Sequence, residues 1–280
     1  MKKPQSLKEA LKGKLSEEEI SKVKRAFDLI GDIVVMEIPE GLEEKKEMIA
    51  KAVMEVQTNV RSVFKKASGM EGEYRVRKLE LLAGEGGTET IYKENGCAFK
   101  LDISKVYFSP RLSTERMRIA ELCKEEEKVL ALFAGVGPFP IVCAKKKKCK
   151  CIGIELNPVA CEYFRFNIKL NKVQDLIEVV EGDVSKIVPG LKFAQEADRI
   201  LMTLPKDAYQ FLPFVLPYAK KGAIVHIYGF YPEENLYSDL ENKINDFAQA
   251  CSRKAETVNK KIVRPYSPRV YQVAMDFRII

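Results

Sequence analysis

The chain has 280 residues, 46% hydrophobic and 31% charged, which excludes a disordered chain and leaves room for one large or two smaller domains. Its 47 lysines and arginines outnumber 40 acidic residues, and the net charge of +7 is compatible with a nucleic-acid partner without establishing one. No apolar segment is long enough for a signal peptide or a membrane span. Seven cysteines without a C-x-x-C pair indicate free thiols in a reducing cytoplasm, and a single histidine, His226, argues against a metal site.

The first hundred residues predict charged helices followed by a small α+β domain. Residues 1–26 carry a thin apolar stripe, and Ser16 stands before three glutamates as the start of a helix. The patterns that follow are a strand bent at Gly31 over residues 27–39, a helix over 42–56, short strands over 60–64 and 79–82, and a hairpin of 90–92 with 98–101 around Asn95-Gly96. We therefore predict a helical segment at 1–26 and an α+β domain at 27–105.

From residue 106 onward, segments of strand length alternate with helical patterns, which predicts a parallel sheet with right-handed crossovers. Expected strands cover 129–133, 151–154, 177–180, 200–202, 223–228, 261–263 and 270–279, and expected helices cover 159–171 and 236–250, besides one that begins at Pro138. The last two strands, joined through a Tyr-Ser-Pro turn, predict an antiparallel hairpin. The sequence thus predicts an α/β, Rossmann-like domain over 106–280 with a mostly parallel sheet of seven strands.

One strand, turn and helix unit, VLALFAGVGPFPIVCA at residues 129–144, has the form of a ligand site. Its apolar strand runs into Ala134-Gly135-Val136-Gly137 and then into a helix N-terminus, an arrangement that lays a ligand across the carboxyl end of the strand. Glu155, 20 positions after Gly135, ends the next apolar run, where a carboxylate can accept hydrogen bonds from ribose hydroxyls. The unit therefore predicts a nucleoside cofactor.

The spacing does not fit a dinucleotide, because Pro140 stands where a third glycine would allow close packing of helix on strand. The stretch F-A-G-V-G-P-F is instead similar to motif I of the class I S-adenosylmethionine methyltransferases. Two further strand ends add groups at the same edge: Asp183 is placed for the adenine amine, and Thr203-Leu204-Pro205 lies where a transferable methyl group would emerge. Taken alone, Asp183 is as well explained by a helix N-cap, but four such strand ends in register favour a cofactor site.

Six segments extend the resemblance to one family. They are YFSPRLSTER (107–116), FAGVGPF (133–139), ELNP (155–158), ADRILMTLPK (197–206), GAIVHIYG (222–229) and YSPRVYQVAMDF (266–277). In this order they resemble the archaeal and eukaryotic tRNA guanine-37 N1-methyltransferase family, and IGDIVVMEIP (30–39) resembles the start of that family's middle domain. The resemblance covers about residues 25–280 and implies a class I methyltransferase domain after an RNA-positioning α+β domain. The family's separate N-terminal domain, which helps to check tRNA shape, is expected to be missing.

The resemblance implies roles for particular residues. Glu115 matches the general base and Arg75 the arginine that holds the target guanine, which suits a reaction in which guanine N1 loses its proton as it attacks a sulfonium methyl group. Arg111 and Arg116 match arginines beside the cofactor and the anticodon loop, and Tyr107 matches an aromatic residue of that pocket. The expected catalytic residues are therefore Glu115, Arg75 and Thr203, the substrate-binding residues are Arg75, Tyr107 and Arg111, and the cofactor-binding residues are Arg116, Phe133, Gly135, Gly137, Glu155, Asp183, Val184, Thr203, Leu204 and Pro205.

Structural roles compete with several of these assignments. Glu115 suits the first turn of a helix, where it would complement the helix dipole, and Arg111 and Arg116 suit ordinary surface ion pairs. The match of the YFSPRLSTER segment favours the functional roles. For the guanine-holding arginine, Arg77 competes with Arg75, since it lies two positions away and on the same face of any strand.

Two positions depart from the patterns. Ala131 stands where many class I enzymes carry an acid at the end of the first strand. Thr203-Leu-Pro replaces the family's Asn-Pro-Pro or Asn-Leu-Pro, so that a hydroxyl is kept and an amide is lost. These changes bear on the particular activity more than on the fold. His226, in an apolar strand, is expected to be a satisfied core histidine and not a catalyst.

The leading hypothesis is S-adenosylmethionine-dependent methylation of N1 of guanosine 37 in tRNA, by a monomer that binds the anticodon loop and uses no metal. The alternatives at the same nucleotide belong to the wybutosine pathway: transfer of the cofactor's aminocarboxypropyl group to a wyosine precursor, or methylation of the tricyclic imidazopurine intermediate. Arg111 and the Leu-Pro-Lys after Thr203 favour methyl transfer. A non-catalytic tRNA-binding protein is disfavoured by the retained Glu115, Arg111 and Glu155, and a nicotinamide dehydrogenase lacks its third glycine.

Overall fold

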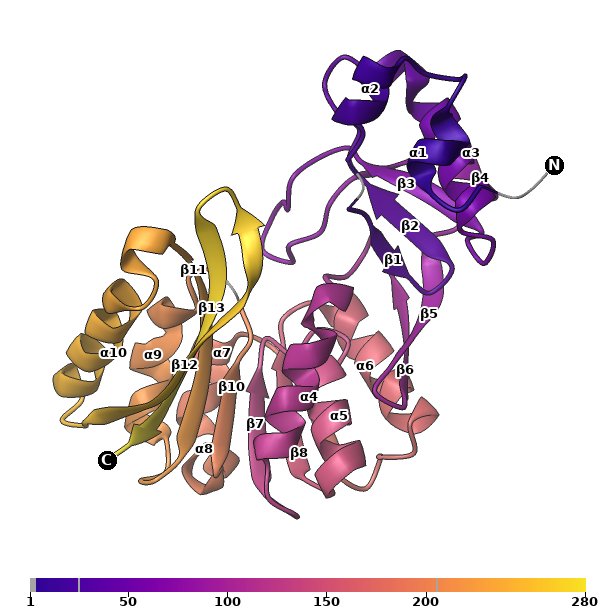
Figure 1. The fold of residues 1–280 in the computed structure, drawn as a ribbon. Coiled ribbons are helices and arrows are strands. Elements are labelled where there is room, and N and C mark those ends of the chain that lie inside the picture. Colours follow the sequence, from indigo (N-terminus) through magenta and orange to yellow (C-terminus); the bar gives the residue numbers. More distant parts are fainter. Residues whose placement is uncertain (1–3, 25, 205) are drawn as a thin grey trace. The chain divides into compact units, whose positions relative to one another are not determined.

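The computed structural model of the protein describes residues 4–24, 26–204 and 206–280. The chain divides into two units, Met1–Arg111 and Leu112–Ile280 (Figure 1). Residues 106–111, which the sequence pattern placed with the second domain, belong to the first unit. The reason is aromatic packing: the ring centroid of Phe108 lies 5.1 Å from that of Tyr92 and 6.3 Å from that of Phe99.

The first unit begins with two short helices, α1 (Leu7–Leu11) and α2 (Glu17–Lys22), in agreement with the apolar stripe. Ser16 starts α2 through a capping box, in which its hydroxyl accepts from the backbone of Glu19 and the Glu19 carboxylate accepts from the backbone of Ser16. Buried side chains of both helices join the core that forms around α3 (Lys46–Val56).

Four strands form the sheet of this unit in the order β1-β2-β3-β4. Their bounds are β1 Asp28–Ile30, β2 Ile33–Met36, β3 Ser62–Lys66 and β4 Leu79–Gly84, and a 3-10 turn, Glu43–Lys45, leads into α3. The expected single strand bent at Gly31 is wrong, because the chain reverses there and β1 pairs antiparallel with β2. Gly31 has a φ of 60°, and an added Cβ would stand 2.1 Å from Thr90 Oγ1, so the reversal requires glycine.

The predicted hairpin around Asn95-Gly96 is confirmed. It consists of β5 (Glu89–Glu94) and β6 (Cys97–Asp102), which pair antiparallel along their whole length. Asn95 and Gly96 both have positive φ, 50° and 75°, which is the backbone conformation that a two-residue turn between twisted strands requires.

The second unit is built on seven strands in the order β12-β13-β11-β10-β7-β8-β9. Their bounds are β7 Lys128–Leu132, β8 Lys150–Glu155, β9 Ile177–Glu181, β10 Arg199–Met202, β11 Ile224–Pro232, β12 Ala255–Ser267 and β13 Val270–Ile279. Strands β7 to β11 run parallel to one another. Strand β13 pairs antiparallel with β11, and β12 pairs antiparallel with β13. The predicted α/β domain with a terminal antiparallel hairpin is confirmed.

Helices cover the sheet and enclose its core (Figure 1). They are α4 Ser113–Leu122, α5 Pro138–Lys147, α6 Pro158–Leu170, α7 Val184–Ile187, α8 Lys192–Glu196, α9 Leu212–Val215 and α10 Ser238–Ala250. Shorter 3-10 turns are Pro110–Leu112, Val188–Gly190, Ala208–Phe211, Leu216–Tyr218 and Glu233–Asn235. Side chains of α7 to α10 form one buried cluster with inward-facing residues of the sheet. The core therefore holds the strand ends in fixed register.

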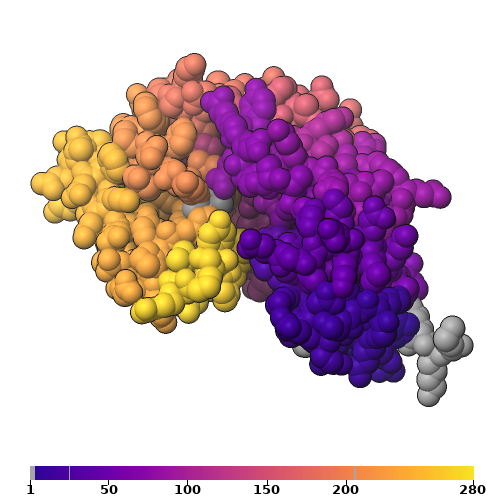
Figure 2. All heavy atoms as spheres, turned by 90° about the horizontal axis from the view of Figure 1, so that it is seen from above, coloured from indigo at the N-terminus to yellow at the C-terminus, as the bar shows by residue number. Residues whose placement is uncertain are grey.

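β12 is much longer than the expected strand over residues 261–263. It is the outermost strand, and most of its residues are exposed, so few apolar side chains mark it in the sequence. Its pairing with β13 shifts register at three places, between Thr257 and Asn259, Ile262 and Arg264, and Pro265 and Ser267. The terminal hairpin, drawn in yellow, lies at the surface of its unit (Figure 2).

Six of the seven cysteines are buried, as small apolar residues are. Over the described ranges, no helix combines the length and the apolar character needed to cross a bilayer. In the same residues, no three or more His, Cys, Asp or Glu side chains gather in a way that could hold a metal ion.

Candidate functional site

The carboxyl ends of β7 and β10 lie side by side where the strand order changes direction. The chain passes from β7 to β8 and β9 on one side and returns to β10 on the other, and ligands of doubly wound sheets bind at such a point. The turn after β7 is left-handed at Phe133, Gly135 and Gly137, with φ of 58°, 56° and 85°. This turn leads directly into α5 at Pro138.

Gly137 is required by packing as well as by its backbone conformation. An added Cβ at Gly137 would stand 2.0 Å from Cδ2 of Phe164, and one at Gly153 in β8 would stand 2.3 Å from Cε1 of the same ring. Phe164 of α6 therefore fills the space beneath the turn. Glycines at both positions allow the turn, β8 and α6 to approach one another closely.

Glu155 closes the turn from the end of β8. Its Oε2 accepts a hydrogen bond from Gly135 N at 2.7 Å, and its Oε1 accepts one from Asn157 N at 2.9 Å. Burial raises the pKa of the Glu155 carboxyl, while the backbone N–H groups of Asn157 and Gly135 oppose this shift. Each oxygen keeps a further lone pair, so the carboxylate can still accept from the hydroxyls of a ligand.

Asp183 occupies the N-cap of α7, the structural role that competed with adenine binding. Its Oδ1 accepts from the hydroxyl and the backbone N–H of Ser185, at 2.8 and 2.9 Å, and these bonds lower the pKa of Asp183. Val184, the next residue, is buried in the core. A contact of Asp183 or Val184 with a cofactor stays a prediction.

Thr203 joins the ends of β10 and β7. Its hydroxyl donates to the carbonyl oxygens of Leu132 and Phe133, at 3.0 and 3.1 Å. Because the single hydroxyl hydrogen is used within the protein, Thr203 can only accept a hydrogen bond from a ligand. Leu204 packs against the core of the unit, and Pro205 lies outside the described residues.

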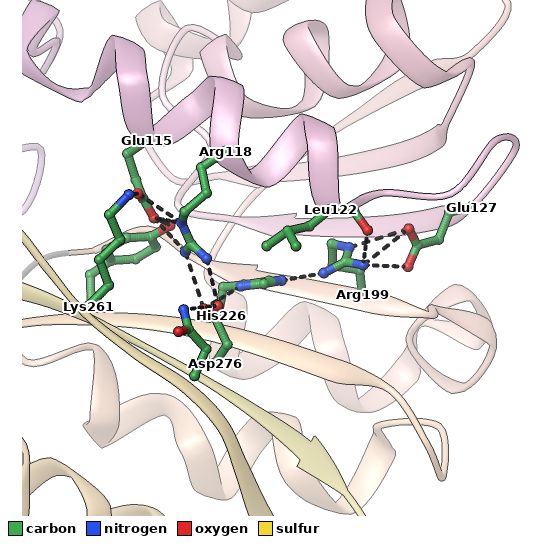
Figure 3. Close-up of polar contacts among 10 residues, drawn as sticks. Glu115, Arg118, Leu122, Glu127, Arg199, His226, Lys261 and Asp276 are labelled. Carbon is green, nitrogen blue, oxygen red and sulfur yellow. Dashed lines mark hydrogen bonds and ion pairs between the residues drawn. The ribbon is translucent and has the colours of Figure 1, made fainter.

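Glu115 is buried in the first turn of α4, where only 2% of its side chain is accessible (Figure 3). Its Oε1 accepts from Arg118 Nη2 at 2.6 Å and from the hydroxyl of Tyr228 at 2.8 Å, and its Oε2 lies 3.7 Å from Lys261 Nζ. Burial raises the pKa of Tyr228 well above its usual value, which keeps this hydroxyl a donor. Glu115 is therefore a desolvated carboxylate surrounded by donors.

Tyr228 also connects Glu115 with the glycine turn. Its ring centroid lies 6.1 Å from that of Phe139, which stands two positions after Gly137 at the start of α5. The guanidinium of Arg116 lies 5.9 Å from the centroid of the same Phe139 ring. Arg116 is almost fully buried, with 1% of the residue accessible, which excludes an ordinary surface ion pair.

The other predicted residues belong to the first unit. The guanidinium of Arg75 lies 5.5 Å from the centroid of the Tyr107 ring, within the range of a cation–π contact. Residues 72–75 form a turn and not a strand, and Arg75 has a φ of 53°. In the described chain, Nε of Arg77 is buried without a hydrogen-bond partner. Arg111 donates to Asp28 Oδ1 at 2.6 Å, which is the ion pair that competed with its functional role.

The sequence pattern gave no role to Arg118, Tyr228 or Asp276, although each lies in or beside a segment that carries the resemblance. Tyr228 in VHIYG and Asp276 in VAMDF are polar residues within apolar strands, and this pattern could have marked them as candidates. His226 is a satisfied core histidine, as expected: Nδ1 lies 2.6 Å from Asp276 Oδ1 and Nε2 lies 2.5 Å from Arg199 Nη1.

Known families match nearly the whole chain. Residues 90–258 match the TRM5/TYW2 methyltransferase domain, and residues 7–88 match the TYW2 N-terminal domain. The expectation that the chain lacks an N-terminal domain of the family is therefore wrong. That expectation considered only the residues before Phe27, whereas the matched domain extends through the four-stranded sheet.

Two curated relatives represent methyl transfer and aminocarboxypropyl transfer. The tRNA (guanine(37)-N(1))-methyltransferase Trm5b of Pyrococcus abyssi is 44% identical over 91% of this chain and 74% of the relative. The tRNA(Phe) (4-demethylwyosine(37)-C(7)) aminocarboxypropyltransferase of Pyrococcus horikoshii is 33% identical over 98% of this chain and 96% of the relative.

Solved structures show the same fold. The crystal structure of Pyrococcus abyssi Trm5b superimposes with a TM-score of 0.88 at 42% identity, covering 100% of this chain and 82% of that one. A structure of aTrm5 in complex with tRNALeu gives a TM-score of 0.85 at 36% identity, covering 100% and 79%. Pyrococcus horikoshii TYW2 in complex with MeSAdo gives 0.82 at 32% identity and covers 98% of both chains.

Proposed function

The chain belongs to the TRM5/TYW2 methyltransferase family, and we propose that it transfers the methyl group of S-adenosylmethionine to N1 of guanosine 37 in tRNA. The observation that carries the proposal is a buried carboxylate, Glu115, joined through Tyr228 and Phe139 to the glycine turn of the sheet. The 44% identity with an archaeal enzyme named for this activity supports it.

The residues at the strand ends suit the chemistry of S-adenosylmethionine. Glu155 can accept from ribose hydroxyls while it holds the turn, and Gly135 and Gly137 leave the backbone of that turn without side chains. Bound there, the cofactor supplies an electrophilic methyl group. Arg116, Phe133, Asp183, Val184, Thr203, Leu204 and Pro205 complete the proposed cofactor site.

Glu115 acts as the general base in this proposal. Guanine N1 carries a proton at neutral pH. As N1 forms its new bond to the methyl carbon, the bond of that carbon to sulfur would break and leave a neutral thioether, and the proton would pass to the Glu115 carboxylate. Burial removes the water that would otherwise solvate the carboxylate, which strengthens its interaction with the N–H group.

The first unit positions the RNA. Arg75 stabilises the negative charge that develops on O6 of the guanine, and Tyr107 orients the Arg75 guanidinium through its ring. Arg111 contacts the anticodon loop. Thr203 is expected among the catalytic residues. Its hydroxyl joins the end of β10 to the end of β7, and in this proposal the guanine binds next to these strand ends.

We further propose that the anticodon loop of tRNA is the macromolecular partner, which agrees with the structure of aTrm5 with tRNALeu. The proposal includes a monomeric enzyme that works in the cytoplasm without a metal ion. The α+β domain at residues 27–105 is its RNA-positioning part.

A second candidate is transfer of the aminocarboxypropyl group to a wyosine precursor at the same nucleotide. It is favoured by the match of residues 7–88 to the TYW2 N-terminal domain and by the aminocarboxypropyltransferase relative at 33% identity. The higher identity with Trm5b places methyl transfer first.

The deciding experiment is mass analysis of nucleosides from tRNA incubated with the protein and S-adenosylmethionine. Unmodified tRNA should yield N1-methylguanosine at position 37, and a tRNA with guanosine 37 replaced by adenosine should yield none. An aminocarboxypropyl adduct on tRNA that carries 4-demethylwyosine, with no product on unmodified tRNA, would transfer the assignment to the second candidate. Glu115→Gln should lower the rate by roughly 10²-fold, as for loss of a general base.

A further inference from the structure

A continuous chain of polar side chains runs from Glu115 through the interior of the second unit (Figure 3). Its members, in order of contact, are Glu115, Arg118, Asp276, His226, Arg199 and Glu127. They come from α4, the loop after it, and strands β10, β11 and β13. Apart from Glu115 and Arg118, neighbours in the chain of contacts are 27 to 158 positions apart, so the fold and not local sequence brings them together.

Arg118 divides one guanidinium between two buried carboxylates. It donates to both oxygens of Glu115, from Nε at 3.0 Å and from Nη2 at 2.6 Å. It also donates to both oxygens of Asp276, from Nη1 at 2.6 Å and from Nη2 at 3.2 Å. Only 2% of the Glu115 side chain and 3% of the Asp276 side chain are accessible, so neither charge is solvated by water.

Asp276 is also held in place by two residues besides Arg118. His226 Nδ1 lies 2.6 Å from Oδ1, and Asn259 Nδ2 donates to Oδ2 at 3.0 Å. Burial alone would raise the pKa of Asp276, but the bond with His226 and the charge of Arg118 outweigh it and hold this pKa well below its usual value. Asp276 is therefore a fixed negative charge behind Arg118.

The orientation of His226 follows from Arg199. A guanidinium can only donate, so His226 must accept from Arg199 Nη1 at Nε2 and carry its proton at Nδ1. Burial lowers the pKa of His226, which keeps the ring neutral. In this tautomer the Nδ1–H group donates to Asp276 and fixes the carboxylate that faces Arg118.

Among the described residues, three side chains contact the Glu115 carboxylate. They are Arg118 on its own helix, the Tyr228 hydroxyl of β11 and the Lys261 ammonium of β12, with Asp276 of β13 behind Arg118. A base must be ionised before it can accept a proton, and it must also retain enough basicity to accept it. Arg118 places a positive charge against the Glu115 carboxylate, and the Asp276 carboxylate shares that charge.

We propose that Arg118 and Asp276 are positioning residues that set the basicity of Glu115, Arg118 by holding the carboxylate ionised and oriented, and Asp276 by sharing the charge of Arg118. This inference rests on the proposed function of Glu115 as the general base. It gives the two residues opposite effects on one titration, which a purely structural network would not produce.

The test is the pH dependence of single-turnover methyl transfer by the full chain, with saturating S-adenosylmethionine and unmodified tRNA. Loss of rate on the acid side reports protonation of Glu115. Arg118→Gln should move this acid limb to higher pH, because the ionised carboxylate loses its cation. Asp276→Asn should move it to lower pH and reduce the plateau rate, because the full charge of Arg118 then acts on Glu115. Arg118→Lys keeps the charge and should keep the limb near its wild-type position while lowering the plateau through lost orientation.

Glu127→Gln is the matched control, since Glu127 is a buried carboxylate of the same chain of contacts that does not touch Glu115 or Arg118. Its acid limb should stay at the wild-type pH. Thermal unfolding and cofactor affinity of each variant establish that it is folded, and where Arg118→Gln is unfolded, Arg118→Lys and Asp276→Asn decide.

The inference is overturned if the Arg118 and Asp276 variants lose rate equally at every pH and the acid limb of the pH profile stays at its wild-type position. Both residues would then have a structural role only. Failure of the proposed function itself has a different signature. If Glu115→Gln retains the wild-type rate and acid limb, then Glu115 is not the base, whatever the Arg118 variants do.

Discussion

The ring of Phe164 occupies the space that a side chain at Gly137 would need, with only 2.0 Å between an added Cβ and Phe164 Cδ2. This contact fixes how closely α6 approaches the turn after β7. It also explains why the second glycine of the motif is required even where no ligand touches it.

Gly137→Ala should therefore destabilise the second unit by roughly 2 kcal/mol or more, through strain at a φ of 85° and overlap with Phe164. Chemical denaturation measures the loss. Gly222→Ala is the control, since Gly222 has a φ of 87° but open space around its Cβ position, so only backbone strain of about 1 kcal/mol applies. Adding Phe164→Leu to Gly137→Ala should recover part of the difference; equal losses in the two glycine variants would contradict the packing argument.

Glu155→Gln should weaken S-adenosylmethionine binding by roughly tenfold or more. The proposed charged acceptor of ribose hydroxyls is lost, and the turn at Gly135 loses its carboxylate partner. Isothermal titration calorimetry gives the affinity. Glu181→Gln, at the paired position of β9, is the control and should bind as wild type does. Unchanged affinity of Glu155→Gln would remove Glu155 from the cofactor site.

Thr203→Val keeps the shape of the side chain and removes the hydroxyl that bonds Leu132 and Phe133. The expected loss of stability is about 1 kcal/mol, with a lower rate of methyl transfer, because the ends of β7 and β10 are no longer tied. Thr203→Ser keeps the hydroxyl and should restore most of both quantities. A Val variant with wild-type rate would show that this tie does not matter for the reaction.

Arg75→Ala should lower kcat/KM for tRNA by roughly 10²-fold or more if Arg75 has its proposed role, because the cation proposed to stabilise the developing charge on O6 is lost. Cofactor affinity should not change, and equilibrium binding of S-adenosylmethionine checks this. Arg77→Ala is the paired variant, because Arg77 is the nearby arginine that competes for the role. A larger loss in Arg77→Ala than in Arg75→Ala would reverse the assignment.

Asp276→Asn should lower stability at neutral pH by about 3 kcal/mol, because Arg118 loses a buried partner. The folded pKa of Asp276 lies below that of the unfolded chain, about 3.9. Its stabilising contribution is thus full above that pH and is lost as the pH falls through the folded pKa. Denaturation of wild type and variant from pH 7 to pH 3 should show a constant difference near neutral pH that begins to narrow below about pH 4. Asp246→Asn, at an exposed position of α10, should follow the wild-type curve throughout.

The sequence predicts the second unit well because its strands are continuous apolar runs and its turn carries two glycines that geometry requires. The expected strands at residues 27–39 and 261–263 differ from the observed ones for the same physical reason. The reversal at Gly31 lies between strands that are both apolar, so the pattern continues across it, and the edge strand β12 is mostly polar, so the pattern misses most of it. Periodicity reports burial and not the direction of the chain.

The candidate site is predictable only in part. Glu155 and the glycines can be found because the motif fixes their spacing along the chain. The contacts of Glu115 with Tyr228 and Lys261 cannot be found in this way, because these residues lie more than a hundred positions away and meet Glu115 only after the sheet has formed. Nor does any local pattern show that the hydroxyl of Thr203 turns back onto β7.

The irregular pairing of β12 has a consequence for solubility. A strand at the end of a sheet offers its backbone to other molecules, and growth by strand addition needs a straight row of N–H and C=O groups. Three register shifts bend this row, Pro265 lacks an N–H group, and Lys260 and Lys261 place positive charge along it. These features protect the sheet against edge-to-edge aggregation at β12, its edge strand on the side of the terminal hairpin.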